Sequence, residues 1–290
     1  MIGLTLALAL MSAGGPDTAA TQEIPPPACR ADAQGVMDYQ ACADATPKGS
    51  AGHAFALINL ATQAYLDHDF PTALRLYDEA APAGQTITSD VLFHTFRGDT
   101  FRHAGRMAES QADARRAWLM LIDDPSVAGD PRDRRELTDD QRLFVLGILL
   151  PILKEGDGAI FERARAMFMT LPATDWPQIS NRATTLEALG DYEAAVAESK
   201  RAVDMQPDDA GLLNNHCYIL VEAGHAAQAL PFCERAIALQ PAEAAFRHSY
   251  ASTLAGLGQC VQAEVQLAEA RRLDPSSVLY RQPLTCTAKR

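Results

Sequence analysis

The sequence repeats itself with a step of 34 residues over its C-terminal half. Glycine, alanine, proline and leucine recur at this step: Gly190, Gly224 and Gly258; Ala195, Ala229 and Ala263; Ala202, Ala236 and Ala270; Pro207, Pro241 and Pro275; Leu186, Leu220 and Leu254. A fixed period of this length indicates a repeat architecture, in which each unit buries its apolar face against its neighbours. The alanine-rich composition, with 7% aromatic residues, favours helices over strands as the repeated element.

The pattern resembles the tetratricopeptide repeat, a pair of antiparallel helices, A and B, of 34 residues. The resemblance implies an all-α fold, a right-handed superhelical solenoid of antiparallel helix pairs. In this register we expect glycine to end helix A and proline to stop helix B. Alanine at the helix-to-helix contacts would let the two backbones approach closely, so these residues are predicted to be structural.

Weaker matches to the same pattern continue upstream. The predicted organisation is two divergent units over 54–124 (54–87 and 91–124), a loop insertion over 125–139, a degenerate unit over 140–173, three repeats over 176–277 (176–209, 210–243 and 244–277) and a C-terminal tail over 278–290. In the degenerate unit we expect Pro151 to interrupt the first helix, since proline cannot donate the helical hydrogen bond. The apolar run 143–153 predicts the most buried helix of the stack.

The N-terminus has the pattern of a secretory signal peptide. An apolar run over 2–11 is followed by small residues up to Gly15, so we predict a signal peptide over 1–15, although no Lys or Arg precedes the run. The run is too short to span a bilayer, and no transmembrane span is expected. Residues 16–53 are interpreted as a Pro-rich spacer and an N-terminal cysteine segment. The predicted location is periplasmic or secreted, with a cytoplasmic protein as the alternative.

The sequence has six cysteines, an even count that fits disulfides in an exported chain. Spacing alone leaves fifteen pairings open, and free buried thiols are the alternative. Placed on antiparallel helix pairs, the cysteines suggest a sequential pairing hypothesis: Cys29 with Cys42, Cys217 with Cys233, and Cys260 with Cys286. No C-x-x-C motif is present, so neither a redox dithiol nor a zinc ribbon is supported.

The resemblance also implies a concave surface lined by helix A. Its sixth position, where the family commonly carries an asparagine able to bond to an extended peptide, is Asn in three units. The implied peptide-groove candidates are Asn59, Ser180, Asn181, Thr184, Asn214, Asn215, Tyr218, His248 and Ser252. The alternative is that these asparagines serve packing and local bonding. Basic residues that would clamp a carboxylate terminus are missing from these positions, so acidic C-terminal peptides are not expected.

The net charge and the motifs of the sequence limit the functions that the chain can have. A net charge of −12 argues against nucleic acid as a partner. No catalytic, phosphate-binding or metal-ligand motif is found, so we expect no enzyme, cofactor or metal. The predicted function is an exported scaffold for protein–protein or protein–peptide interaction, in a bacterial cell envelope. The alternatives are an intracellular adaptor, or a metal-binding or enzymatic protein that uses the His216, Cys217 and Cys233 cluster.

Overall fold

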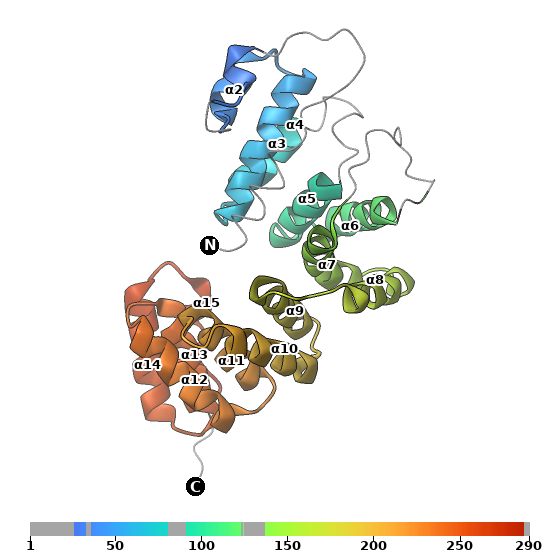
Figure 1. Cartoon of the computed structure of the whole chain (residues 1–290). Helices are drawn as coiled ribbons and strands as arrows, with labels where there is room; N and C mark the ends of the chain where they lie inside the picture. The colour runs from blue at the N-terminus through green and yellow to red at the C-terminus, as the bar shows by residue number, and fades with distance from the viewer. Residues whose placement is uncertain (1–25, 33–35, 81–90, 123, 125–136, 287–290) are drawn as a thin grey trace. The chain divides into compact units, whose positions relative to one another are not determined.

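The computed structural model describes residues 26–32, 36–80, 91–122, 124 and 137–286. Over these residues the chain is all-α, with fourteen α-helices, one short 3₁₀-helix and no strand (Figure 1). It forms two compact units, Met1–Thr170 and Leu171–Arg290, whereas the sequence period favoured one continuous stack. The predicted signal peptide and most of the predicted loop insertion lie outside the described residues.

The N-terminal unit consists of a short leading segment and three antiparallel helix pairs. Its elements are η1 (Pro27–Cys29), α2 (Tyr39–Ala45), α3 (Ala51–Leu66), α4 (Phe70–Ala80), α5 (Val91–His103), α6 (Met107–Leu121), α7 (Asp139–Lys154) and α8 (Gly158–Thr170). Consecutive helices pack as the pairs α3/α4, α5/α6 and α7/α8. The described helices of the chain include none with the length and apolarity that crossing a membrane requires.

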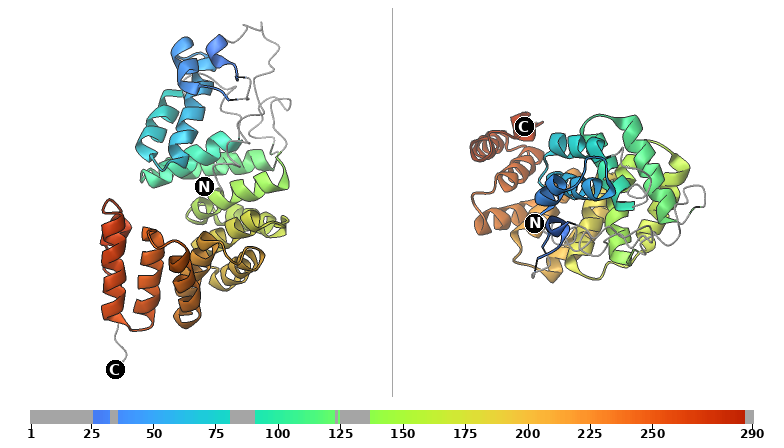
Figure 2. Two further views of the ribbon diagram at one scale, coloured as in Figure 1. Left: turned by 60° about the vertical axis from the view of Figure 1, so that its left-hand side comes forward. Right: turned by 90° about the horizontal axis from the view of Figure 1, so that it is seen from above.

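The C-terminal unit contains three further pairs and a short terminal helix. Its elements are α9 (Trp176–Ala188), α10 (Tyr192–Met205), α11 (Ala210–Glu222), α12 (Ala226–Leu239), α13 (Ala244–Gly256), α14 (Cys260–Leu273) and α15 (Val278–Arg281). Figure 2 gives two further views of these helix pairs. The first helices of successive pairs also contact one another, α9 with α11 and α11 with α13. The unit is therefore a repeat solenoid of stacked helix hairpins.

The glycines of the 34-residue period end the A helices, as predicted. Gly190, Gly224 and Gly258 have φ of 78°, 80° and 78°, the left-handed region that glycine adopts without steric strain. The residue after each glycine donates its backbone N–H to a carbonyl five residues earlier, for example Asp191 to Leu186 at 2.8 Å. The same turn follows α3, where His68 takes φ of 60° in place of glycine.

The small residues of the period lie in the helix-to-helix contacts, which confirms their structural assignment. Ala195, Ala229 and Ala263 are at most 2% exposed, as are Ala183, Cys217 and Ala251 on the A helices. The B helices end two residues before Pro207, Pro241 and Pro275, because the residue before a proline avoids the helical region.

A larger side chain at one of these contacts should force the helices apart. We expect Ala229→Leu to lower the free energy of unfolding by about 1 to 3 kcal/mol, because Ala229 is fully buried in a core cluster with Cys217, Leu220 and Cys233. Ala227→Leu, on the exposed side of the same helix, is the matched control and should change it by about 0.5 kcal/mol or less. Urea unfolding followed by circular dichroism measures both; equal losses would contradict the packing role of Ala229.

The predicted interruption at Pro151 is wrong. Helix α7 runs from Asp139 to Lys154 through Pro151, with the capping box of Thr138 and Gln141 at its start. Pro151 lies in the last turn, so it removes a single helical hydrogen bond, and the burial of Leu149, Leu150 and Ile152 around it offsets that loss. Seven residues of 143–153 are buried, but α5 has nine buried residues and α11 has eight, so the prediction that this is the most buried helix of the stack is wrong.

Candidate functional site

The A helices of the C-terminal unit share a surface that the B helices do not cover. We call the partly or fully exposed side chains of α9, α11 and α13 the A-helix surface. Helices α10, α12 and α14 pack against the opposite, buried faces of their partners. Side chains four residues apart on one A helix therefore lie in a row along this surface.

Five of the predicted candidates come together on two adjacent helices of this surface, and a sixth, Asn214, is buried on the second of these helices. On α9, Ser180 and Asn181 are half-buried and Thr184 is exposed, with the Thr184 hydroxyl donating to the Asn181 carbonyl at 3.0 Å. On α11, Asn215 and Tyr218 are half-buried and Asn214 is 9% exposed. Over the described residues, the side chains of Ser180, Asn181 and Asn215 have no hydrogen-bond partner, so they are free to bind another molecule.

Two other candidates do not present a free side chain. Asn59 is 6% exposed in the N-terminal unit, and its Nδ2 donates to the Phe55 carbonyl at 2.8 Å, the local bonding that the sequence left open as an alternative. His248 is 8% exposed, with its ring 5.3 Å from that of Tyr280 in the C-terminal tail. The expectation that His248 lines an open surface is therefore wrong, because the tail covers it. Ser252, one turn on, is half-buried and donates to the His248 carbonyl at 3.1 Å.

The structure adds two carboxylates that the sequence analysis missed. Glu187 is half-buried on α9, and Glu222 is exposed at the end of α11. Burial raises the pKa of Glu187, and the negative charge of Glu222 adds to the rise. Helical spacing could have found them, since they lie one turn beyond the candidates Thr184 and Tyr218.

Tyrosine rings border the two carboxylates. Burial, together with the charges of Glu222 and Glu187, raises the pKa of Tyr218 to about 12. Tyr192, the first residue of α10, is 36% exposed and also affects Tyr218 electrostatically. The phenol of Tyr218 therefore stays protonated near neutral pH.

Asn214 has a buried acceptor without a partner. Its Oδ1 is inaccessible to solvent and forms no hydrogen bond to the described part of the chain. Leaving such a group unpaired costs about 1 to 3 kcal/mol, so native proteins seldom keep one without a reason. Asn214 lies on the same face of α11 as Tyr218 and Glu222, at four-residue steps.

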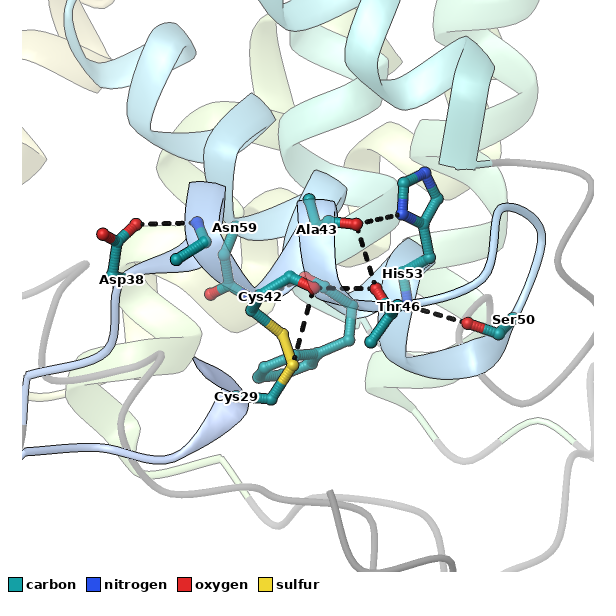
Figure 3. Close-up of a disulfide and its surroundings, with 10 residues drawn as sticks. Cys29, Asp38, Cys42, Ala43, Thr46, Ser50, His53 and Asn59 are labelled. Atoms are coloured by element: carbon teal, nitrogen blue, oxygen red, sulfur yellow. Dashed lines mark hydrogen bonds between the residues drawn. A yellow bond between two sulfur atoms is a disulfide. The ribbon is translucent and has the colours of Figure 1, made fainter. Parts of the chain in front are cut away.

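The structure brings the six cysteines together in the three pairs that the sequence suggested. The Cα–Cα distances are 4.6 Å for Cys29–Cys42, 5.4 Å for Cys217–Cys233 and 5.6 Å for Cys260–Cys286, within the range of disulfides. Figure 3 shows the first pair, where Cys42 lies on α2 and its carbonyl accepts from the Thr46 hydroxyl at 2.8 Å. In the same view the His53 ring contacts the Ala43 carbonyl at 2.9 Å.

The hydrophobic core contains the cluster of His216, Cys217 and Cys233. His216 is 3% exposed, with Nδ1 2.8 Å from the Ser199 hydroxyl and its ring edge-on to Phe232. Burial, followed by the charge of Lys200, lowers the pKa of His216 to about 4, so the imidazole is neutral near pH 7. Within the described residues no group of three or more His, Cys, Asp or Glu is arranged to hold a metal ion.

Comparison with known proteins relates one helix pair and the overall fold to the tetratricopeptide repeat. The family model described as tetratricopeptide repeat matches residues 180–209, which span most of the α9/α10 pair. No curated protein matches the chain. A tetratricopeptide repeat protein from Parabacteroides merdae is similar in structure, with 15% identity and a TM-score of 0.55 over 82% of this chain and 84% of that chain.

A second solved structure is also similar to this chain in its fold. A chain in the crystal structure of the APC/C hetero-tetramer Cut9-Hcn1 aligns with 84% of this chain and 43% of its own length, at 12% identity and a TM-score of 0.51. At these identities the likeness shows the fold alone. The repeat match over residues 180–209 and the stacked helix pairs show a tetratricopeptide-type repeat fold; proteins with this repeat are generally non-enzymatic scaffolds for protein–protein interaction.

Proposed function

We propose that the chain is an exported scaffold that binds a peptide or protein segment on the A-helix surface of its C-terminal unit. The observation that carries this proposal is the group of half-buried polar side chains without a hydrogen-bond partner in the described residues, formed by Ser180 and Asn181 on α9 and by Asn215 on α11. Amide and hydroxyl groups on adjacent helices can pair with the backbone of an extended segment, while the flanking helix surface supplies apolar contact.

Two features support an exported location such as a bacterial cell envelope. The apolar run over 2–11 with small residues behind it is typical of a signal peptide. The three cysteine pairs have geometry suited to disulfides, which persist in oxidising compartments and are rare in the cytosol. We propose that all three pairs are oxidised in the functional protein.

Site-specific crosslinking in the native cell tests this proposal. A photoreactive phenylalanine analogue replaces Thr184, which is exposed on the A-helix surface, and in a separate variant replaces Ala197, which is exposed on α10 away from that surface. We expect discrete crosslinked species from the Thr184 position and none from the Ala197 position. After fractionation, these species should be found in the envelope fraction, with the chain lacking residues 1–15.

Other results would contradict separate parts of the proposal. Discrete adducts in the cytoplasmic fraction with an intact N-terminus would favour the intracellular adaptor. Adducts from Ala197 but not from Thr184 would move the binding surface to the B helices. A readily detected activity that is lost on replacing His216 and unaffected by changes at Thr184 would favour chemistry over scaffolding.

A further inference from the structure

The C-terminal tail begins a further repeat and stops after one turn. Helix α15 starts one 34-residue step beyond Ala244, the first residue of α13. Tyr280 therefore takes the repeat position of Phe246, and the two side chains are similarly buried, at 9% and 8% exposed. The helix ends two residues before Pro283, because the residue before a proline avoids the helical region. The tail thus supplies only the first turn of a helix A.

This tail lies over α13, the third helix of the A-helix surface. The ring of Tyr280 is 5.3 Å from that of His248 and belongs to one buried cluster with Ala251, against which Leu284 also packs. Arg271 on α14 donates through Nε to the Tyr280 carbonyl at 2.6 Å. The tail therefore closes the part of the A-helix surface that α13 would add to α9 and α11.

The Cys260–Cys286 pair holds the end of the tail against α14. It joins the first residue of this helix to the tail, with the Cα atoms 5.6 Å apart. Within residues 278–286, Tyr280 alone is buried, and Leu284 is half-buried. Ordering the whole tail costs more free energy than burying these two apolar side chains returns. The covalent bond therefore decides whether the tail stays closed.

Of the three cysteine pairs, Cys260–Cys286 is the most open to a reductant. Both of its residues are half-buried, and Cys260 lines an open hollow on the surface of α14. By contrast, Cys217 and Cys233 are 0% and 1% exposed, and Cys42 of the N-terminal pair is 0% exposed. A thiolate must reach a sulfur atom to break a disulfide, so access decides which pair is reduced first.

We propose that the tail is a latched cover that ends the A-helix surface at α11, and that reduction of Cys260–Cys286 by a dithiol extends this surface to α13. One thiolate of the dithiol attacks a sulfur of the pair, which breaks the S–S bond and forms a mixed disulfide; the second thiol of the reagent then displaces the remaining cysteine. The dithiol is oxidised to a disulfide, and its electrons and protons leave Cys260 and Cys286 as thiols. This inference rests on the proposed function and concerns regulation of the same surface. The fully oxidised protein is the closed state.

Modification of His248 by diethyl pyrocarbonate reports whether the cover is open, because the reagent must reach the imidazole ring. The full-length chain is exposed briefly to the reagent, and the modified histidines are quantified by mass spectrometry. We expect Cys260→Ala/Cys286→Ala to raise the rate at His248 at least about tenfold over the unreduced wild type, as local opening would. Cys29→Ala/Cys42→Ala, which removes the pair of the N-terminal unit, is the matched control and should leave His248 protected.

Stepwise reduction tests the order in which the pairs open. The folded wild type is treated with increasing dithiothreitol, free thiols are alkylated, and the labelled cysteines are identified by mass spectrometry. We expect Cys260 and Cys286 to be labelled before Cys217 and Cys233, with the rate at His248 rising in parallel. Tyr280→Ala keeps the latch but removes the ring that covers His248, so it should raise that rate without any reductant.

Crosslinking in the native cell links the cover to binding. A photoreactive phenylalanine analogue at Ser252, which is half-buried on α13, should give no adduct in the wild-type background. In the Cys260→Ala/Cys286→Ala background it should give the same species as the Thr184 position. Adducts from Thr184 in both backgrounds with none from Ser252 would overturn the cover and leave the proposed function standing. Loss of adducts from both positions, with His248 still uncovered by reduction, would overturn the proposed function instead.

Three further outcomes would also overturn the latched cover. The first is an unchanged rate at His248 after Cys260 and Cys286 have been reduced. The second is labelling of Cys217 before Cys260. The third is an equal rise at His225, a half-buried histidine of the same unit away from the tail, because that result would assign the change to unfolding of the whole unit.

Discussion

Replacing Asp113 with alanine is expected to lower the stability of the N-terminal unit by about 3 to 5 kcal/mol, the largest effect we predict for a single substitution. Asp113 on α6 is held by two residues of α5. Arg97 donates through Nε to Oδ2 at 2.6 Å and through Nη2 to Oδ1 at 2.8 Å, and His94 Nδ1 lies 2.7 Å from Oδ1. The Arg97 side chain is 17% exposed, so loss of the carboxylate would leave a largely buried cation unpaired.

The exposed ion pair of Asp78 with Arg106 provides the matched control. These groups are 3.2 Å apart, and the Asp78 side chain is 53% exposed. Asp78→Ala should change the free energy of unfolding by about 1 kcal/mol or less, because solvent screens an exposed pair. Urea unfolding of both variants measures the difference, and losses of equal size would refute the special role that we assign to Asp113.

The pKa of the Asp113 carboxyl group predicts how the stability of the N-terminal unit changes in acid. Burial alone would raise the pKa of Asp113, but hydrogen bonds from Arg97 and His94 outweigh it and hold the pKa below its ordinary value. The stabilisation is therefore fully present above the unfolded pKa of about 3.9 and is lost as the pH falls through the lower, folded pKa. Part of the acid sensitivity of the wild type should be missing in Asp113→Ala.

Much of the fold could be predicted from the sequence because the repeat uses residues with strong local or steric requirements. Glycine at 190, 224 and 258 ends a helix through backbone conformation, and alanine at 195 or 229 is required wherever two backbones approach closely. The turn after α3 shows the limit of this reasoning. His68 adopts the left-handed conformation there without being glycine, so no sequence signal marks it.

The site residues were harder to predict because their exposure depends on which helices pack together. His248 occupies the same repeat position as Ser180 and Asn214, but Tyr280 of the tail covers it. The effect of Glu222 on the pKa of Glu187 likewise acts between α9 and α11, two helices that contact each other in the fold. The Arg97, His94 and Asp113 network likewise joins residues 16 to 19 apart, whose side chains meet only when α5 and α6 pack.

Removing the Cys217–Cys233 pair is expected to lower the stability of the C-terminal unit by about 2 to 4 kcal/mol. The pair ties α11 to α12 across 16 residues, and both side chains lie in the core with Leu220 and Ala229. A bond that closes a loop of this length restricts the unfolded chain. Cys217→Ala/Cys233→Ala is the appropriate variant, because alanine adds no polar group to this apolar cluster.

The reductant provides the control, since it breaks the bond without changing the sequence. Reduced wild type should unfold at a lower urea concentration than the unreduced protein, whereas the midpoint of Cys217→Ala/Cys233→Ala should move less on reduction because only the other two pairs remain. Titration of thiols in the denatured, unreduced wild type should find none. If six thiols react, the pairs are unbonded, the stabilisation assigned to them is absent, and the argument from cysteines for an oxidising compartment fails with it.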